Sequence, residues 1–345
     1  MDKCTLKRKN PNTIQKLSKE SIKIIQESGI ADYIEIDKLV HIGPKKYVNG
    51  NFYEKYKDEI YNFTINENDV WIITTGRSGT TVTQEMVWQI CNDMDFEGGF
   101  KTPLIERFPY FEYALMFGHR KELLLKKSSN DPKECASIET IFTPEWEKPK
   151  VSNQRFYKSH LPISLLPMEL TQKAKIVYMA RNPKDMAISF YHFLKQYGKE
   201  PPNFENYWNL WETGLMIGHP YLEHVLEAWN LRNQDNVLFL FYEDFVKDNR
   251  AVILKLCKFF GKNYTVKQID KLVDHIKIEN FKQNTSVNRD YFDYTPPLVE
   301  NFIRQGKVGS YKEELFTKEL NEKANNWIKE LYKKTDFRFP HAAMK

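Results

Sequence analysis

Four short segments of strand length, each followed by a loop and then by a helical pattern, constrain the fold of this chain most. They are VWIIT (70–74), RFYKSHLP (155–162), KIVYMA (175–180) and NVLFLFYEDF (236–245). Strands that alternate with helices along a chain form a mostly parallel sheet covered on both faces. The sequence therefore predicts a single α/β domain with a mostly parallel central sheet flanked by helices.

Two parts of the chain lie outside this pattern. The first 45 residues are polar, with one amphipathic stretch from Thr13 to Ser28 that has the apolar spacing of a helix. We expect an N-terminal extension over residues 1–45 and the main domain over residues 46–345. The segment at about 121–151 has no strand pattern and ends in proline-rich turns, so we expect it to be an insertion or lid.

The overall charge limits the class of ligand. The net charge of +5, from 51 basic and 46 acidic residues, suits a protein that holds a small polyanion and is too mild for a nucleic-acid footprint. No apolar run of about 18 residues predicts a membrane span. The charged start and the scattered cysteines favour the cytoplasm. The histidines form no HExxH or similar pattern, so we expect no metal site.

The loop after the first of these segments, TGRSGTT, has the composition of an anion-binding loop. It joins an apolar strand to an amphipathic helix, and its glycines let the backbone approach a ligand. Its side chains are small, hydroxylated or cationic: Gly76, Arg77, Ser78, Gly79, Thr80 and Thr81. The GxxxxGK[ST] spacing of a nucleoside triphosphatase is absent, so the loop is P-loop-like without being that motif. By itself it is equally compatible with an ordinary turn.

Three further loops carry polar side chains. KSHLP brings Lys158 and His160, RNPKDMAIS brings Arg181 and Ser189, and a basic loop near the C-terminus brings Arg304, Gln305 and Gly306. The loops that follow parallel strands meet at one edge of a sheet, where such folds bind ligands. Taken singly, each group has an ordinary structural reading, such as a surface arginine or a structural histidine. The loops at 75–81, 158–162 and 181–185 each stand at the end of a predicted strand, and their shared position predicts a single site.

Six motifs in this order, TGRSGTT, ERFP, KSHLP, RNPKDMAISFYHF, FLFYEDF and IRQGKVGSYK, resemble those of the cytosolic sulfotransferase family. The resemblance runs from about residue 40 to the C-terminus. The long middle segment and Arg77 are similar to the insect retinol dehydratase branch of that family. The resemblance implies an enzyme that moves a sulfuryl group from 3′-phosphoadenosine 5′-phosphosulfate (PAPS) to an acceptor and releases adenosine 3′,5′-bisphosphate (PAP), without a metal.

The resemblance also implies roles for individual residues. His160 matches the catalytic base, with Lys158 and Arg77 placed to stabilise the departing phosphate; Arg77 stands where most of the family has lysine. The residues implied for cofactor binding are Arg77, Ser78, Gly79, Thr80, Thr81, Val82, Arg181, Ser189, Tyr242, Ile278, Arg304, Gln305 and Gly306. Val82 and Ile278 stand where the family commonly has aromatic residues. Phe108, Tyr110 and Phe111 are expected to line the acceptor pocket.

The acceptor is expected to be a small hydrophobic molecule, such as a phenol, a steroid or a retinoid-like alcohol, or an amine, as in small-molecule metabolism or detoxification. Two alternatives remain at this point: an ATP-dependent phosphoryl transferase, and a non-enzymatic small-molecule or nucleotide-binding protein on the same fold. No nucleic-acid or membrane partner is expected. The family's dimer motif, KxxxTVxxxE, is not matched because Lys312 and Thr317 are one residue too far apart, which leaves a homodimer open.

Overall fold

Four parallel strands form the central sheet of the protein, whose computed structural model describes residues 8–31, 35–128, 131–149, 154–196, 200–287, 303–312 and 314–340. The strands are β4 (Val70–Ile73), β5 (Phe156–Ser159), β6 (Lys175–Ala180) and β7 (Val237–Phe241). They lie in the order β5-β4-β6-β7, and each neighbouring pair is parallel. The predicted α/β domain with a mostly parallel central sheet is confirmed.

Side chains of the central strands alternate between two apolar cores, one on each face of the sheet. In β4, Trp71 and Ile73 belong to the first core, whereas Val70 and Ile72 belong to the second. This alternation is the period of two that an extended chain imposes. All four side chains are fully buried, so the strand has to be apolar along its whole length. That requirement made the strand visible in the sequence.

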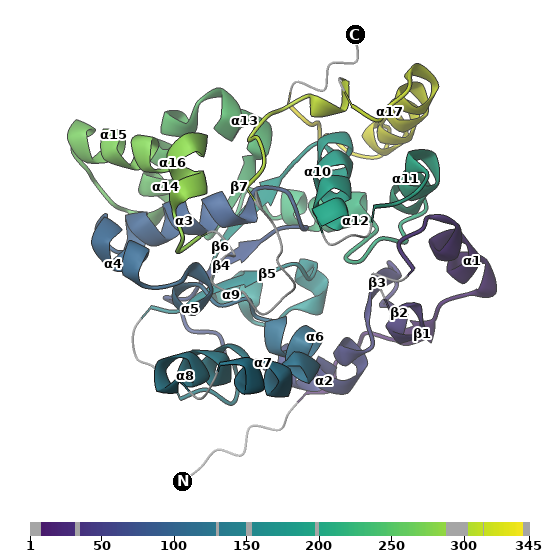
Figure 1. The fold of residues 1–345 in the computed structure, drawn as a ribbon. Helices are drawn as coiled ribbons and strands as arrows, with labels where there is room; N and C mark the ends of the chain where they lie inside the picture. Colours follow the sequence, from purple (N-terminus) through teal and green to yellow (C-terminus); the bar gives the residue numbers. More distant parts are fainter. Residues whose placement is uncertain are drawn as a thin grey trace.

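Helices cover both faces of the sheet (Figure 1). The second core includes side chains of α3 (Thr80–Cys91), α14 (Asn249–Phe260), α15 (Val266–His275) and α16 (Ile278–Gln283). The first core includes side chains of α10 (Pro183–Gln196), α11 (Phe204–Glu212), α12 (Tyr221–Asn230) and α17 (Lys318–Tyr332). None of the helices in the described ranges combines the length and apolarity that crossing a bilayer requires.

Short helices connect these layers. They are α2 (Phe52–Tyr61), α4 (Phe96–Lys101), α5 (Leu104–Arg107), α6 (Tyr113–Phe117), α9 (Leu170–Lys173), α13 (Tyr242–Lys247) and the 3₁₀ turns η1 (Ile36–Lys38), η2 (Gly118–Arg120), η3 (Ile163–Leu165) and η5 (Ser310–Lys312). The strand expected over residues 236–245 ends earlier, because Tyr242 already begins α13. Glu243 and Asp244 lie in the first turn of α13, where negative charge is favourable, and they would be costly in a buried strand.

A second, antiparallel sheet forms near the N-terminus from β1 (Ile14–Lys16), β2 (Leu39–Ile42) and β3 (Tyr47–Gly50). The helix expected over residues 13–28 is therefore wrong at its start. Ile14 pairs with Ile42 in the sheet, and α1 (Lys19–Glu27) begins only after Ser18, whose hydroxyl accepts a hydrogen bond from the Ser21 N–H. The boundary expected after residue 45 falls between the paired strands β2 and β3, and Ile25 belongs to the same core as Trp71.

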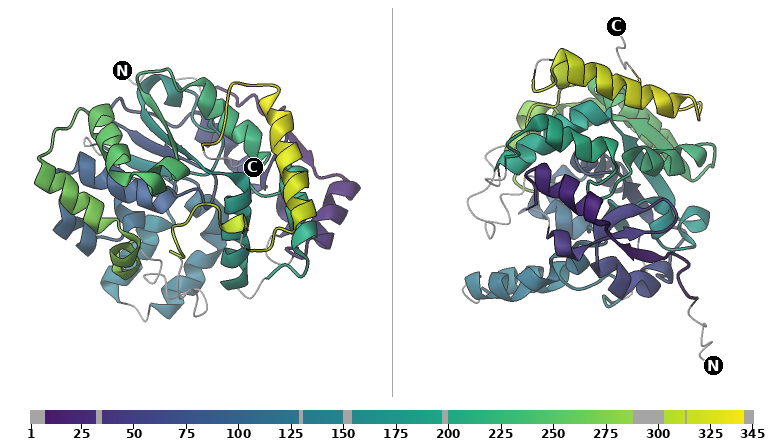
Figure 2. Two further views of the ribbon diagram at one scale, coloured as in Figure 1. Left: turned by 90° about the horizontal axis from the view of Figure 1, so that it is seen from above. Right: turned by 90° about the vertical axis from the view of Figure 1, so that its right-hand side faces the viewer.

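The expected insertion at 121–151 contains α7 (Lys121–Lys127) and α8 (Pro132–Ile141). The two helices share a small apolar cluster with α6, formed by Leu124, Ile138, Ile141 and Phe142 and packed against Tyr113 and Phe117. Figures 1 and 2 place α7 and α8 at the edge of the molecule opposite α17. The use of this segment as a lid stays a prediction.

Candidate active site

The loop between β4 and α3 contains two residues in the left-handed region of backbone conformation. Arg77 has φ of +70° and Gly79 has φ of +98°. A Cβ atom on Gly79 would lie only 2.5 Å from the Tyr242 ring, so the position has no room for a side chain. The loop thus packs directly on Tyr242 and turns into α3, whose first N–H groups have no partner within the helix. Such a helix start favours an anion.

Two of the three hydroxyls expected to bind a ligand make contacts within the loop. The Ser78 hydroxyl donates to the Thr75 carbonyl, and the Thr80 and Thr74 hydroxyls lie 2.6 Å apart. Ser78 is fully buried, and Thr80 is 7% exposed. Thr81 is half-buried at the start of α3. The loop is therefore fixed in shape by bonds between its own side chains and backbone.

Two arginines link this loop to α10 and to the C-terminal loop. Arg77 Nε donates to Ser189 Oγ at 3.2 Å, and Arg181 donates to the Arg77 carbonyl at 3.0 Å and to the Lys307 carbonyl at 3.1 Å. Arg181 is 6% exposed, and its Nε has no hydrogen-bond partner among the described residues. An anionic oxygen of a ligand would accept a hydrogen bond from this unused donor of the buried guanidinium.

The three residues expected to contact the adenine are placed by different parts of the fold. The Arg181 guanidinium lies 4.3 Å from the centre of the Tyr242 ring. Val82 is buried in the second core, and Ile278 lies within 3.3 Å of where a Cβ on Gly306 would be. The structure thus brings the C-terminal loop against α16 beside the expected nucleotide-binding residues.

The C-terminal loop is held by two carboxylates that the sequence did not single out. Asp185 of α10, fully buried, accepts from the Gly309 N–H at 2.8 Å and from the Ser310 hydroxyl at 3.1 Å. Arg304 donates to Glu314 at 2.9 Å. Gln305 is exposed. Asp185 stands in the RNPKD motif, but only the folded chain shows that it faces this loop.

His160 lies directly after β5, beside the loop between β4 and α3. Its Nδ1 is 2.7 Å from the Thr74 carbonyl oxygen and 3.3 Å from the Thr74 hydroxyl. Because a carbonyl can only accept, Nδ1 carries the proton in the neutral ring, and Nε2 is the basic nitrogen. In this tautomer the acceptor lone pair of the ring lies on Nε2.

The residues expected to line the acceptor pocket separate in the structure. Phe111 packs against Trp71 in the first core, whereas Phe108 packs in the second. Of the three, Tyr110 is the one whose ring meets His160, with centroids 5.1 Å apart. The Lys158 ammonium lies 4.3 Å from the centre of the same Tyr110 ring.

A small cavity next to Tyr110 reaches the insertion. It measures about 20 Å³, and it is lined by Ile105, Glu106, Pro109, Tyr110, Tyr113, Thr140, Ile141, Glu145 and Lys148. This volume holds one water molecule. An acceptor at this position would therefore require α8 to move away from Tyr110 and Tyr113.

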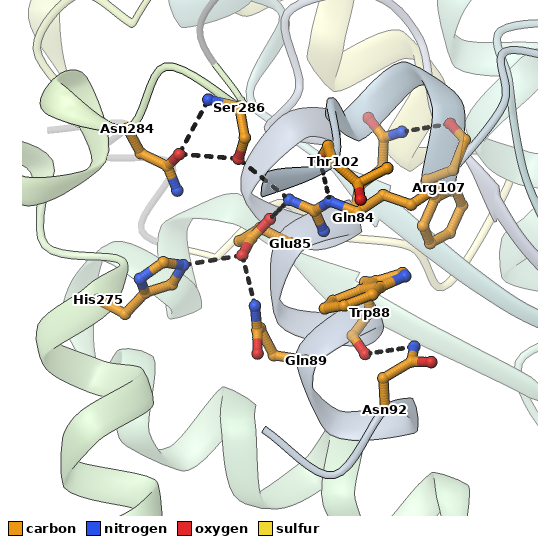
Figure 3. A network of polar contacts seen from close by, with 11 residues as sticks. Gln84, Glu85, Trp88, Gln89, Asn92, Thr102, Arg107, His275, Asn284 and Ser286 are labelled. Atoms are coloured by element: carbon orange, nitrogen blue, oxygen red, sulfur yellow. Dashed lines mark hydrogen bonds and ion pairs between the residues drawn. The ribbon is translucent and has the colours of Figure 1, made fainter. Parts of the chain in front are cut away.

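A buried polar network supports the helix that follows the loop (Figure 3). Glu85 of α3 is fully buried and pairs with Arg107 and with His275, whose Nε2 lies 2.8 Å from the carboxylate. Burial by itself raises the pKa of Glu85, but the hydrogen bonds and charges of His275 and Arg107 outweigh it and lower that pKa below the ordinary 4.5. The network joins α3 to α5 and α15.

Comparison with known proteins gives a consistent result. The sequence profile described as "Sulfotransferase domain" matches residues 67–336. The chain is 32% identical over 302 residues to the luciferin sulfotransferase of Photinus pyralis, covering 85% of this chain and 79% of that protein. It is 29% identical over 291 residues to sulfotransferase 1A1 of Canis lupus familiaris, covering 81% of this chain and 90% of that protein.

Solved structures extend this similarity to the fold. The chain is similar to retinol dehydratase in complex with androsterone and PAP, with a TM-score of 0.84, 33% identity and coverage of 96% of this chain and 98% of that chain. The complex of retinol dehydratase with retinol and PAP gives a TM-score of 0.85 at 33% identity, covering 96% of this chain and 99% of that chain.

Proposed function

The chain belongs to the sulfotransferase domain family and is a sulfotransferase, and from this premise we propose that PAPS is its donor and a small hydrophobic alcohol, phenol or amine its acceptor. One observation carries the proposal: Arg77, Arg181 and Ser189 meet beside the loop after β4, and His160 borders the same loop through Thr74. The proposal thus places anion-binding groups and a base in one site.

The residues present suit the two anionic ends of PAPS. The loop backbone and the start of α3 would hold the 5′-phosphosulfate. Arg181, with its unused Nε, would hold the 3′-phosphate together with Ser189, Arg304 and Gly306. The adenine would lie among Tyr242, Val82 and Ile278. The absence of aromatic rings at the last two positions means that apolar contact replaces stacking there.

The chemistry then divides between His160 and the cationic groups. When bound, PAPS supplies the sulfuryl group. His160, with Nδ1 held by Thr74, would accept the acceptor's proton at Nε2. Lys158 and Arg77 would stabilise the negative charge that develops on the leaving phosphate, which is the effect expected of a preorganised site.

The acceptor is proposed from the aromatic and aliphatic side chains around Tyr110, whose ring meets His160. Tyr110, Tyr113 and Ile141 line the small cavity there, and Ile141 comes from the segment that we propose as a lid. The retinol dehydratase structures hold androsterone or retinol together with PAP. We therefore propose steroid-like and retinoid-like alcohols as the first acceptors to test, with a phenol beside them. Retinol would distinguish a stable sulfate from a dehydrated product.

Thermal unfolding with PAP, ADP or ATP in the absence of metal tests the donor site. A ligand present at 100 times its Kd raises stability by about 2.7 kcal/mol, so PAP is expected to raise Tm by several degrees. Arg181→Ala should weaken PAP binding by about 10- to 150-fold, the equivalent of 1.5–3 kcal/mol for a hydrogen bond to a charged group.

The matched control for Arg181→Ala is Arg250→Ala. Arg250 is a half-exposed arginine on α14 that pairs with Asp270, and its removal should leave the PAP shift unchanged. A shift with ATP and none with PAP would contradict the assignment of Arg181 and Ser189 to a 3′-phosphate.

A further inference from the structure

The peptide group of His160 is held on both sides by buried side chains. Its N–H donates to Glu112 Oε1 at 2.7 Å, and its carbonyl oxygen lies 3.3 Å from His224 Nε2. Glu112 is 1% exposed and His224 is fully buried. Neither residue belongs to the anion-binding loops, and they come from different elements, Glu112 from the turn before α6 and His224 from α12.

Glu112 spans the whole turn that carries His160. Its second oxygen, Oε2, accepts from the Ser159 hydroxyl at 2.9 Å, and Ser159 Oγ in turn accepts from the Leu161 N–H at 3.0 Å. One carboxylate thereby fixes three consecutive residues. Burial raises the pKa of Glu112 to about 7, against the opposing effects of its hydrogen bonds and of the Lys158 charge. Burying a carboxylate at such a position costs free energy, and the hydrogen bonds from the His160 N–H and the Ser159 hydroxyl offset that cost.

His224 has its donor and acceptor roles fixed by its neighbours. Nε2 faces the His160 carbonyl and must donate, so Nδ1 accepts from the Tyr178 hydroxyl at 2.9 Å. Burial lowers the pKa of His224, which favours this neutral form. Tyr178 is a fully buried residue of β6. The His160 carbonyl is thereby connected to the central sheet.

The same turn joins the base to the acceptor wall. Tyr110 and Tyr113 flank Glu112, and the Tyr113 N–H donates to the Tyr110 carbonyl at 2.9 Å. Tyr110 meets the His160 ring, and both tyrosines line the small cavity. The turn that carries Glu112 thus contacts both the base and the small cavity.

We propose that Glu112 and His224 are positioning residues for sulfuryl transfer, which hold the His160 peptide so that Nε2 meets the acceptor oxygen in the reactive geometry. The inference rests on the proposed function. The contact of Nδ1 with Thr74 orients the His160 ring, and the peptide group sets where the ring stands, so the position of Nε2 depends on both. A misplacement of about 1 Å can lower a rate by about 100-fold.

Two substitutions of Glu112 separate geometry from charge. Glu112→Gln keeps the length and can accept from the His160 N–H while donating to Ser159, but it has no charge. Glu112→Asp keeps the charge and shortens the side chain by one methylene, so it no longer reaches both partners. We expect kcat to fall by about 10- to 100-fold in Glu112→Asp and by less than about threefold in Glu112→Gln.

The corresponding pair of substitutions at His224 is His224→Gln and His224→Ala. Glutamine can place an amide N–H near the position of Nε2, so His224→Gln should retain most of kcat, while His224→Ala should lose about tenfold or more. In every variant, the Tm shift with PAP and the acceptor KM should stay near those of the wild type. Both kcat and the acceptor KM are measured with PAPS and with whichever of 4-nitrophenol, androsterone and retinol the wild type uses.

Other outcomes would overturn the inference in distinguishable ways. A kcat that is retained in Glu112→Asp and lost in Glu112→Gln would show that charge, and not position, matters. Equal loss of PAP binding and kcat in all variants would show a purely structural role. Unchanged kcat throughout would remove the inference alone, whereas a wild type that neither binds PAP nor transfers a sulfuryl group would remove the proposed function and this inference with it.

Discussion

The hydrogen bond to the Thr74 carbonyl selects the tautomer of the His160 ring. The Thr74 carbonyl fixes the proton on Nδ1, and a carbonyl carries no full charge. A carbonyl partner orients the imidazole ring and selects its tautomer without itself adding a full charge.

Replacement of His160 by alanine should lower kcat by about 10²–10⁴-fold, the usual contribution of a general base, while PAP binding is retained. His41→Ala provides the matched control, since His41 makes the same kind of bond, from Nδ1 to the Lys46 carbonyl at 2.9 Å, in β2. Steady-state rates and PAP thermal shifts of the two variants would be compared. Retained turnover in His160→Ala would contradict the role of base.

Arg77 illustrates how one side chain connects two expected anion sites. The resemblance to sulfotransferases implies that it stabilises the departing phosphate, and in the structure its Nε reaches Ser189, a residue implied for the 3′-phosphate. Its guanidinium also lies 5.2 Å from the centre of the Phe193 ring. Arg77 therefore lies between the two ends of the proposed donor site.

At the scale of elements, the connection from β4 to α3 is the part of the fold on which the site depends most. The loop residues are ordered by hydroxyl pairs and by close packing on Tyr242. Rigid loops of this kind offer their N–H groups to an anion without an ordering cost on binding. The same packing makes the loop intolerant of added volume.

Gly79→Ala should therefore impair both stability and PAP binding. The left-handed conformation alone costs a non-glycine residue about 1–2 kcal/mol, and here the new Cβ would also lie 2.5 Å from the Tyr242 ring. Gly261→Ala is the control, because Gly261 has φ of +65° with nothing within 4 Å of its Cβ position. Urea unfolding and PAP shifts should show a clearly larger loss for Gly79→Ala. Equal losses would mean that the contact with Tyr242 is unimportant.

At the scale of the whole molecule, the network around Glu85 connects three helices across the second core. Removing one member leaves a buried charge without its partner, which typically costs about 3–5 kcal/mol. Arg107→Met should therefore lower the free energy of unfolding by about that amount. The double variant Arg107→Met, Glu85→Met should recover much of it, since apolar replacements of buried pairs are often neutral or stabilising. Urea unfolding at pH 7 measures both, and a double variant as unstable as the single one would contradict the argument.

The pH dependence of this network has a definite sign. Because the folded-state pKa of Glu85 is lowered, its stabilisation is fully present above the ordinary value of 4.5 and is lost as the pH falls through the folded-state pKa. The free energy of unfolding should therefore fall more steeply below pH 4.5 in the wild type than in Glu85→Gln. Parallel curves would show that Glu85 does not carry this dependence.

The sequence by itself determined the central sheet and the loops at its edge. Strands buried on both faces must be apolar throughout, so β4 and β6 were visible as apolar runs, and glycines and hydroxyls marked the loop after β4. The N-terminal sheet was not foreseen, because strands as short as β1, with two exposed residues of three, carry no clear pattern. The central sheet and its loops could be predicted because their patterns are local and involve residues that are neighbours in the chain.

The tertiary structure decided which side chains meet. Glu112 and His224 lie 48 and 64 residues from His160, and Asp185 lies 124 residues from Gly309. Phe108 and Phe111 had the same aromatic character in the sequence as Tyr110, yet they pack in opposite cores, and only Tyr110 turns to His160. Local patterns report burial and backbone preference, whereas contacts between distant residues follow from how the sheet and helices pack. The site was therefore predictable as a set of loops, and its geometry was not.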